Sequence, residues 1–211
     1  MIKNKTNQSN KLYKKNLKKH GVGPKALLWK SKGAAHQRFR EFWKEIDFTD
    51  KKVLDIGCGF GEMGKFLLKR YKGVDYSGID IVPEFIKEAK IQVPGGKFEV
   101  IDFLNEKIDG SYDVVIASGV LNSNSEGNKI NGDNMNYRKN AITKMFELTT
   151  KTLAFNMLGA HPQPKNDPTS NIWYADSLEI VKHCMSLTRR VVLRANYHPR
   201  DFTIIMQKIR S

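Results

Sequence analysis

The stretch VLDIGCGFGEMG, residues Val53–Gly64, holds four glycines within eight residues directly after a short apolar run. A glycine-rich turn between a buried strand and a helix lets backbone N–H groups approach a ligand closely, and a helix N-terminus favours a negative group. The part from Gly59 to Gly64 is also a literal G-x-G-x-x-G, the fingerprint of dinucleotide-binding proteins. The stretch therefore predicts a nucleotide-type site after a strand and leaves the ligand to be decided.

Two carboxylates flank these glycines and distinguish between the possible ligands. Asp55 lies in the strand end, two residues before Gly57, and Glu62 lies at the junction of loop and helix. A pyrophosphate carries about two negative charges, so two carboxylates beside it would weaken its binding. S-adenosylmethionine carries an ammonium, a sulfonium and one carboxylate but no phosphate. The flanking acids therefore favour this cofactor over a nicotinamide dinucleotide.

Strand-like runs alternate with helix-like runs along the chain, which indicates β-α-β crossovers and a mostly parallel sheet. The last two strand-like runs are joined by too short a link for a crossover, so we expect them to form an antiparallel hairpin. Strands are expected over 51–56, 76–81, 97–103, 112–118, 152–158, 189–195 and 202–209, and helices over 62–71, from Pro83 onward, over 140–148 and after the capping box Asp176–Glu179. We predict an α/β fold with a doubly wound, mostly parallel seven-stranded sheet, an antiparallel last strand, helices on both faces and an N-terminal helical extension.

Length and composition exclude several classes of protein. The 211 residues suit one domain, and no apolar run approaches the 18 or so residues that a membrane-spanning helix needs. We therefore expect a soluble, cytoplasmic protein. Cys58 and Cys184 are too few and too far apart in sequence for a disulfide framework or a zinc site, so we expect buried thiols and no bound metal.

At this point the sequence resembles a known family, because VLDIGCGFG is very similar to the first motif of the class I (seven-β-strand) S-adenosylmethionine-dependent methyltransferases. Gly57 then takes the place of the first glycine, and the resemblance runs from Lys51 to the C-terminus. It implies that Asp80 binds the ribose, with Ile81 on the adenine, and that Asp102 contacts the adenine amino group beside Phe103. The full set of cofactor-binding residues predicted in this way is Asp55, Gly57, Cys58, Gly59, Gly61, Asp80, Ile81, Asp102, Phe103, Ser118 and Gly119.

The net charge of +14 is a property of the N-terminus, because the first 40 residues hold ten lysines, two arginines and no acidic residue. We expect residues 1–20 to form a basic, flexible arm and 21–50 a helical extension that lines part of the substrate pocket. Residues 51–211 would form the Rossmann-like methyltransferase domain. The arm could contact phosphate groups or anionic lipid, but it lacks arginine and has a single aromatic residue, so a solvated leader is favoured.

The sequence indicates less about the acceptor than about the cofactor. The N/D-P-P-Y/F and Pro-Cys motifs of several nucleic-acid methyltransferases are absent, which favours a small-molecule acceptor methylated on O, N or C by in-line displacement. An RNA or protein methyltransferase that uses the lysine-rich arm, an NAD-dependent oxidoreductase and a non-catalytic S-adenosylmethionine-binding module stay as alternatives. The acceptor, the oligomeric state and a role of loop 122–136 as a lid stay open. Candidate general bases are His161, His36 and Tyr174, and candidate substrate contacts are Trp29, Lys32, Gln37, Arg40, Asn122 and Asn156.

Overall fold

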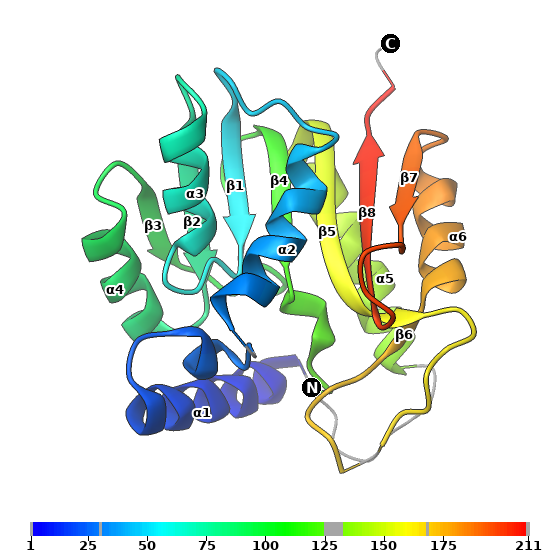
Figure 1. Cartoon of the computed structure of the whole chain (residues 1–211), viewed down its shortest axis with the longest axis horizontal. Coiled ribbons are helices and arrows are strands. Elements are labelled where there is room, and N and C mark those ends of the chain that lie inside the picture. The colour runs from blue at the N-terminus through cyan, green and yellow to red at the C-terminus, as the bar shows by residue number, and fades with distance from the viewer. Residues whose placement is uncertain (1, 30, 125–132, 168, 210–211) are drawn as a thin grey trace. The chain divides into compact units, whose positions relative to one another are not determined.

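The structure is a computed structural model that describes residues 2–29, 31–124, 133–167 and 169–209 (Figure 1). The chain divides into two compact units, residues 1–109 and 110–211, and each is described here by itself.

The first unit contains three parallel strands in the order β3-β2-β1, where β1 is Lys52–Ile56, β2 is Asp75–Asp80 and β3 is Lys97–Val100. The crossover helices are α3 (Glu62–Arg70) and α4 (Pro83–Gln92). Each helix buries an apolar face, which comprises Met63, Gly64 and Leu67 in α3 and Phe85, Ile86 and Ala89 in α4. The strand–glycine loop–helix unit predicted from the sequence is confirmed.

The N-terminal segment of this unit is helical, with α1 over Ile2–His20, the 3₁₀ turn η1 over Pro24–Leu27 and α2 over Lys32–Trp43 (Figure 1). The segment expected to be an arm is thus helical, and its flexibility stays a prediction. Tyr13 and Leu17, one helical turn apart, pack on a buried apolar cluster, while the intervening lysines are exposed. The high lysine content concealed an amphipathic helix, because only a narrow stripe of the helix carries apolar side chains.

The second unit contains β4 (Tyr112–Ser118), β5 (Thr149–Ala160), β7 (Val191–Arg194) and β8 (Asp201–Gln207) in the order β4-β5-β8-β7. β4 and β5 are parallel, whereas β8 runs antiparallel to both β5 and β7. The predicted antiparallel hairpin at the C-terminus is therefore confirmed. The short strand β6 (Ala175–Asp176) pairs with the end of β5.

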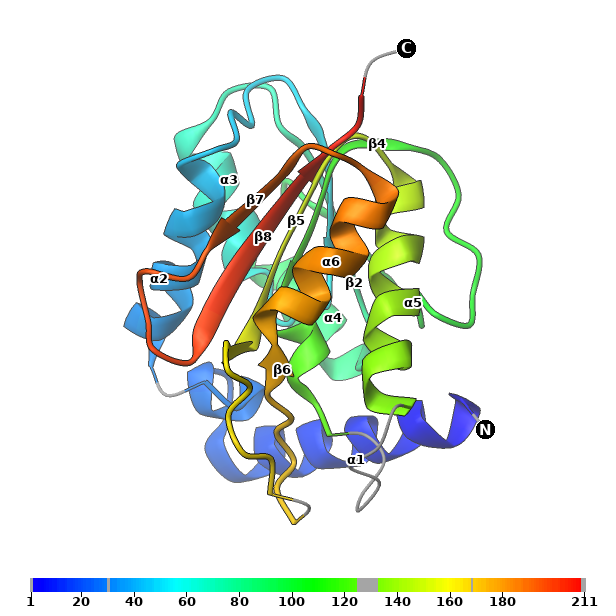
Figure 2. The same cartoon turned by 90° about the vertical axis from the view of Figure 1, so that its right-hand side faces the viewer.

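Helices α5 (Asp133–Leu148) and α6 (Ser177–Leu187) lie side by side in this unit (Figure 2). The Asp176 side chain caps α6 by accepting hydrogen bonds from the Leu178 and Glu179 amides at 2.9 and 3.2 Å, as the capping box predicted. The expected loop 122–136 is shorter than predicted, because η2 covers Val120–Asn122 and α5 begins at Asp133. Whether the loop acts as a lid depends on residues 125–132, which lie outside the described residues.

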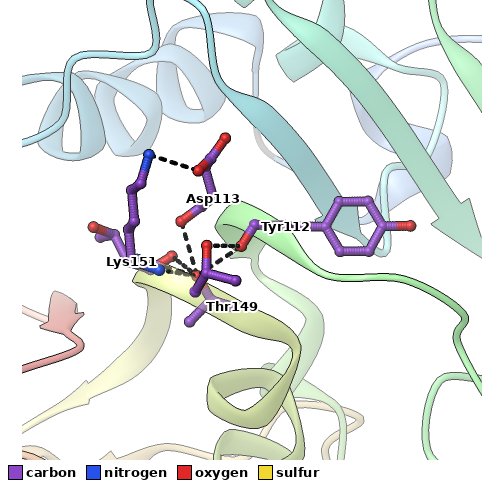
Figure 3. Close-up of polar contacts among 6 residues, drawn as sticks. Tyr112, Asp113, Thr149 and Lys151 are labelled. Carbon is purple, nitrogen blue, oxygen red and sulfur yellow. Dashed lines mark hydrogen bonds and ion pairs between the residues drawn. The ribbon is translucent and has the colours of Figure 1, made fainter. Parts of the chain in front are cut away.

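A polar cluster holds the beginnings of β4 and β5 together, as Figure 3 shows. The Thr149 hydroxyl donates to the carbonyl oxygens of Tyr112 and Asp113 at 3.3 and 2.9 Å, next to an irregularity in the β4–β5 register. The Asp113 carboxylate pairs with the Lys151 ammonium at 2.7 Å. These contacts support a structural role for Asp113, at the opposite end of β4 from its carboxyl terminus.

Both thiols are buried, as expected, with Cys58 8% and Cys184 0% exposed. None of the helices in the described part of the chain has the length and apolar character needed to span a bilayer.

We expect Gly64→Ala to destabilise the protein, because a Cβ at this position would lie 2.5 Å from Cε1 of Tyr76. Overpacking of this kind costs about 1–3 kcal/mol. Gly33→Ala, in helix α2, is the matched control, since its Cβ would lie 3.6 Å from Ser31 Oγ, an ordinary contact distance. Urea unfolding monitored by circular dichroism measures both variants. Equal stability of the two would contradict the packing described here.

Candidate cofactor site

The glycine loop after β1 is fixed by its own backbone. Gly57, Gly59 and Gly61 all have positive φ, at 69°, 55° and 79°, a region that side chains other than glycine rarely adopt. The amides of Gly57 and Cys58 donate to the carbonyl oxygen of Ile79 at 2.8 and 3.0 Å. The loop is therefore tied to the carboxyl end of β2, and its glycines alternate because the turn needs a left-handed residue at every second position.

Asp80 connects the end of β2 to this loop. Its carboxylate accepts a hydrogen bond from the Gly59 amide and another from the Val82 amide, both at 3.0 Å. Burial raises the pKa of Asp80 to about 6, against the lowering effect of these backbone hydrogen bonds. A third backbone amide, that of Ile81, also contributes a hydrogen bond, but the side chain is only partly buried and a carboxylate has about four acceptor positions. Asp80 is thus held in place with capacity left for a ligand's hydroxyl groups.

Asp55 has a partner that the sequence did not indicate. The Tyr76 hydroxyl lies 2.5 Å from Asp55 Oδ2, and both side chains are buried, with Asp55 3% exposed. Burial raises the pKa of Asp55 to about 7, the hydrogen bond from Tyr76 lowers it, and the nearby charge of Asp80 raises it. Asp55 therefore supports the base of the loop. Its contact with a cofactor stays a prediction.

The remaining predicted residues of the first unit lie near the ends of β2 and β3. Ile81 is partly buried and packs on the apolar cluster next to the loop. Asp102 accepts hydrogen bonds from the Leu104 amide at 3.2 Å and from the Asn105 side chain at 2.7 Å, so it shapes the turn after β3. Phe103 is buried, at 6% exposure.

Sequence reasoning missed the residue that lies directly on the loop. A Cβ added at Gly59 would lie 3.1 Å from both terminal methyl groups of Leu27, which belongs to η1. Gly59 itself is buried. No periodicity or spacing connects Leu27 with the glycine motif, because the contact joins segments that are distant in the sequence.

Two candidates in the N-terminal extension, Trp29 and His36, pack on the same ring, that of Phe39. Trp29 meets the Phe39 ring edge-on at 6.0 Å, and the Arg38 guanidinium lies 4.9 Å from the centre of the Trp29 ring. His36 lies 5.8 Å from Phe39, between ring centres. These contacts give Trp29 and His36 packing roles in an aromatic cluster.

The other three candidates of this segment are Gln37, Arg40 and Lys32, which all lie on α2. Gln37 is partly buried and Arg40 is exposed, both on α2, and Lys32 is the first residue of that helix.

In the second unit, the Ser118 hydroxyl donates to Asn156 Oδ1 at 3.3 Å, while Asn156 Nδ2 is buried without a hydrogen-bond partner among the described residues. Gly119 adopts a left-handed conformation, with φ of 78°, before η2. Asn122 Oδ1 accepts the Leu158 amide at 2.7 Å, so the side chain connects the end of β4 to β5. Asn156 thus keeps a free donor, whereas Asn122 is committed to the fold.

The two candidate bases of this unit are also held by neighbours. His161 Nδ1 lies 3.1 Å from Asp176 Oδ2, and the His161 side chain is exposed. Hydrogen bonds from Gln163 and Asn166 to the Tyr174 carbonyl, at 2.7 and 2.9 Å, shape the loop after β5. The Arg200 guanidinium lies 5.8 Å from the centre of the Tyr174 ring.

Arg138 on α5 is a second residue that the sequence did not single out. It is fully buried, donates to the carbonyl oxygens of Leu121, Ser123 and Asn134 at 2.8 Å each, and lies 4.0 Å from the centre of the Trp173 ring. Burial lowers its pKa to about 10, so the guanidinium stays charged at neutral pH. Arg138 fixes the path of the chain after β4.

Comparison with known proteins shows which proteins this chain is similar to. A family described as "Methyltransferase domain" matches residues 54–130. A protein named as a methyltransferase in Invertebrate iridescent virus 6 is 39% identical over 69 residues, which cover 33% of this chain and 26% of the viral protein. One from Mycobacterium tuberculosis is 25% identical over 158 residues, covering 74% of this chain and 92% of that protein. The chain thus matches about a quarter of the first relative's length and nearly all of the second's.

Solved structures show the same fold. Magnesium protoporphyrin IX methyltransferase from Synechocystis PCC 6803 with bound SAM superposes with a TM-score of 0.59 at 17% identity, covering 82% of this chain and 80% of that one. The DhpI–SAH complex superposes with a TM-score of 0.66 at 13% identity, covering 97% and 95%. The fold is therefore the Rossmann-like α/β fold with a mostly parallel sheet and an antiparallel last strand, as predicted. Residues 54–130 of this chain are thus similar to a methyltransferase domain, and its fold is that of solved structures bound to SAM or SAH.

The two buried carboxylates predict how stability depends on pH. The folded pKa values of Asp55 and Asp80, about 7 and about 6, lie above the value of about 4 for a free aspartate, so the folded state binds more protons between pH 4 and 7. The free energy of unfolding should therefore fall as the pH rises through this range. Asp55→Asn should make this fall smaller, as measured by urea unfolding at several pH values.

Asp75→Asn is the control, because it makes the same substitution at a strand aspartate that, unlike Asp55, is partly exposed. Asp75 lies on β2 and pairs with Lys97. Its pH dependence should match that of the wild type. An unchanged pH dependence in Asp55→Asn would show that this carboxyl does not titrate as described.

Proposed function

We propose that this chain binds S-adenosyl-L-methionine against the glycine loop and transfers its methyl group to a small-molecule acceptor. The observation that carries the proposal is the hydrogen bond from the Gly59 amide to the Asp80 carboxylate. It places a fixed hydrogen-bond acceptor, suited to ribose hydroxyls, directly beside a loop shaped for close approach of a ligand.

The residues of the first unit fit the parts of this cofactor. Asp80 would accept the ribose hydroxyls, and Ile81, which is only partly buried, would offer apolar surface to the adenine. The N-cap residue of helix α3 is Gly61, which has no side chain to cap the first-turn amides, so the cofactor carboxylate would find donors there.

Charge favours a cationic ligand. Burial is the main cause of the raised pKa of Asp55, and the nearby charge of Asp80 raises it further. A ligand that brings an ammonium and a sulfonium would relieve this repulsion, whereas a pyrophosphate would increase it. This argument favours S-adenosylmethionine over NAD.

Bound S-adenosylmethionine supplies an electrophilic methyl group, and the protein's contribution is to hold an acceptor nucleophile in line with it and to exclude water. His161, oriented by Asp176, is the candidate to take up the acceptor's proton. The small-molecule class is supported by the similarity in fold to an enzyme named for magnesium protoporphyrin IX.

A nucleic-acid acceptor is the second candidate, and the outer face of α1 favours it. Lys11, Lys15, Lys18 and Lys19 are all exposed on this helix. Binding of RNA through these lysines should weaken steeply with salt and disappear when all four are replaced by glutamine.

The cofactor is tested by calorimetry with S-adenosylmethionine, S-adenosylhomocysteine and NAD. We expect binding of the first two, and binding of NAD alone would overturn the proposal. Release of S-adenosylhomocysteine is then assayed across metabolite pools and total RNA. Turnover that requires a metabolite fraction supports a small-molecule acceptor, and turnover that requires RNA supports the alternative.

We expect Asp80→Asn to weaken cofactor binding by about tenfold to a hundredfold, because it removes a charged hydrogen-bond acceptor from the ribose. Glu106→Gln is the control, since this carboxylate also accepts a backbone amide, that of Asp102, but is exposed. Calorimetry measures both, with circular dichroism to verify folding. Wild-type affinity in Asp80→Asn would contradict the assignment of the ribose site.

A further inference from the structure

The N-terminal segment reaches the glycine loop through one side chain. The methyl groups of Leu27 lie where a side chain at Gly59 would begin, 3.1 Å from the ideal Cβ position. The absence of a side chain at Gly59 therefore serves two purposes, because the positive φ requires glycine and Leu27 uses the open space.

The segment is docked by contacts beside the loop. Ala26 is fully buried and packs with Phe60, Val82 and Phe85, while Tyr13 and Leu17 of α1 cover the same cluster. The Tyr13 ring meets Phe85 edge-on at 5.7 Å, and Lys14 pairs with Glu84 at 3.0 Å. Both partners belong to the first turn of α4, directly after Asp80 and Ile81.

Docking leaves the predicted ligand contacts accessible. Asp80, Ile81 and Asp102 are each only partly buried although α1 and η1 are in place. The docked segment thus lies against the loop and leaves these three residues partly exposed.

We propose that Leu27 is a wall of the cofactor site, and that α1 and η1 form a lid that docks more tightly when the cofactor is bound. The inference rests on the proposed function, since it takes the ligand to be S-adenosylmethionine. A ligand that contacts Leu27 stabilises the docked state, and by linkage a weaker docked state lowers the affinity for the ligand.

Calorimetry with S-adenosylhomocysteine tests whether Leu27 lines the cofactor site. Leu27→Ala should weaken binding by roughly tenfold, as expected when apolar contact with one leucine side chain is lost. Leu28→Ala is the matched control, because Leu28 is the next residue, carries the same side chain and is 48% exposed. Its affinity should stay within about twofold of the wild type.

Leu17→Ala tests the lid separately, since Leu17 packs on the docking cluster from α1. It should also weaken binding, and it keeps the proposal testable if Leu27→Ala does not fold. Hydrogen exchange of residues 11–28 should slow when S-adenosylhomocysteine is added to the wild type, and slow less in Leu17→Ala.

Three outcomes are informative in different ways. Tighter binding by Leu27→Ala would mean that Leu27 blocks the site, which overturns the proposal. Wild-type affinity in both Leu27→Ala and Leu17→Ala, together with no slowing of hydrogen exchange in residues 11–28 when S-adenosylhomocysteine is added, would also overturn it. If the wild type binds neither S-adenosylmethionine nor S-adenosylhomocysteine, the proposed function itself fails, which calorimetry on the wild type alone reveals.

Discussion

The placement of two carboxylates near the ends of neighbouring parallel strands is the constraint on which the candidate site depends. Asp55, the next-to-last residue of β1, is buried, and Asp80, the last residue of β2, is partly buried, so each would be costly to enclose without donors. Asp55 receives the Tyr76 hydroxyl, and Asp80 receives the amides of Gly59 and Val82. These hydrogen bonds orient the loop and the start of α4, so satisfying the buried charges also shapes the site.

The packing around Tyr76 follows from the same constraint. Its ring must lie beneath α3 to bring the hydroxyl to Asp55, and this leaves no room for a side chain at Gly64. The fourth glycine of the motif therefore serves helix–strand packing, whereas Gly57, Gly59 and Gly61 serve the turn. The literal G-x-G-x-x-G from Gly59 to Gly64 therefore combines glycines of the turn with a glycine of the helix–strand packing.

The N-terminal segment shows how composition can mislead. The lysine-rich sequence predicts a solvated arm, and in the structure two apolar side chains at one helical turn's spacing, Tyr13 and Leu17, pack on an apolar cluster. Helical segments gain most of their stability from packing one face, so a few well-placed side chains outweigh many exposed charges. Tyr13 and Leu17 were visible in the sequence, but the surface that they cover was not.

Local pattern alone determined the order of strands and helices, the glycine turn, the α6 cap and the C-terminal hairpin, because each depends on neighbouring residues or on loop length. It also indicated Asp80, since the end of a parallel strand next to a glycine loop is a recurrent ligand position. Tertiary structure decided the partners: Tyr76 for Asp55, Leu27 for Gly59, and the carbonyl groups that surround Arg138. These contacts join residues far apart in the chain, and hydrogen-bond satisfaction and close packing select them only when the strands have been brought together.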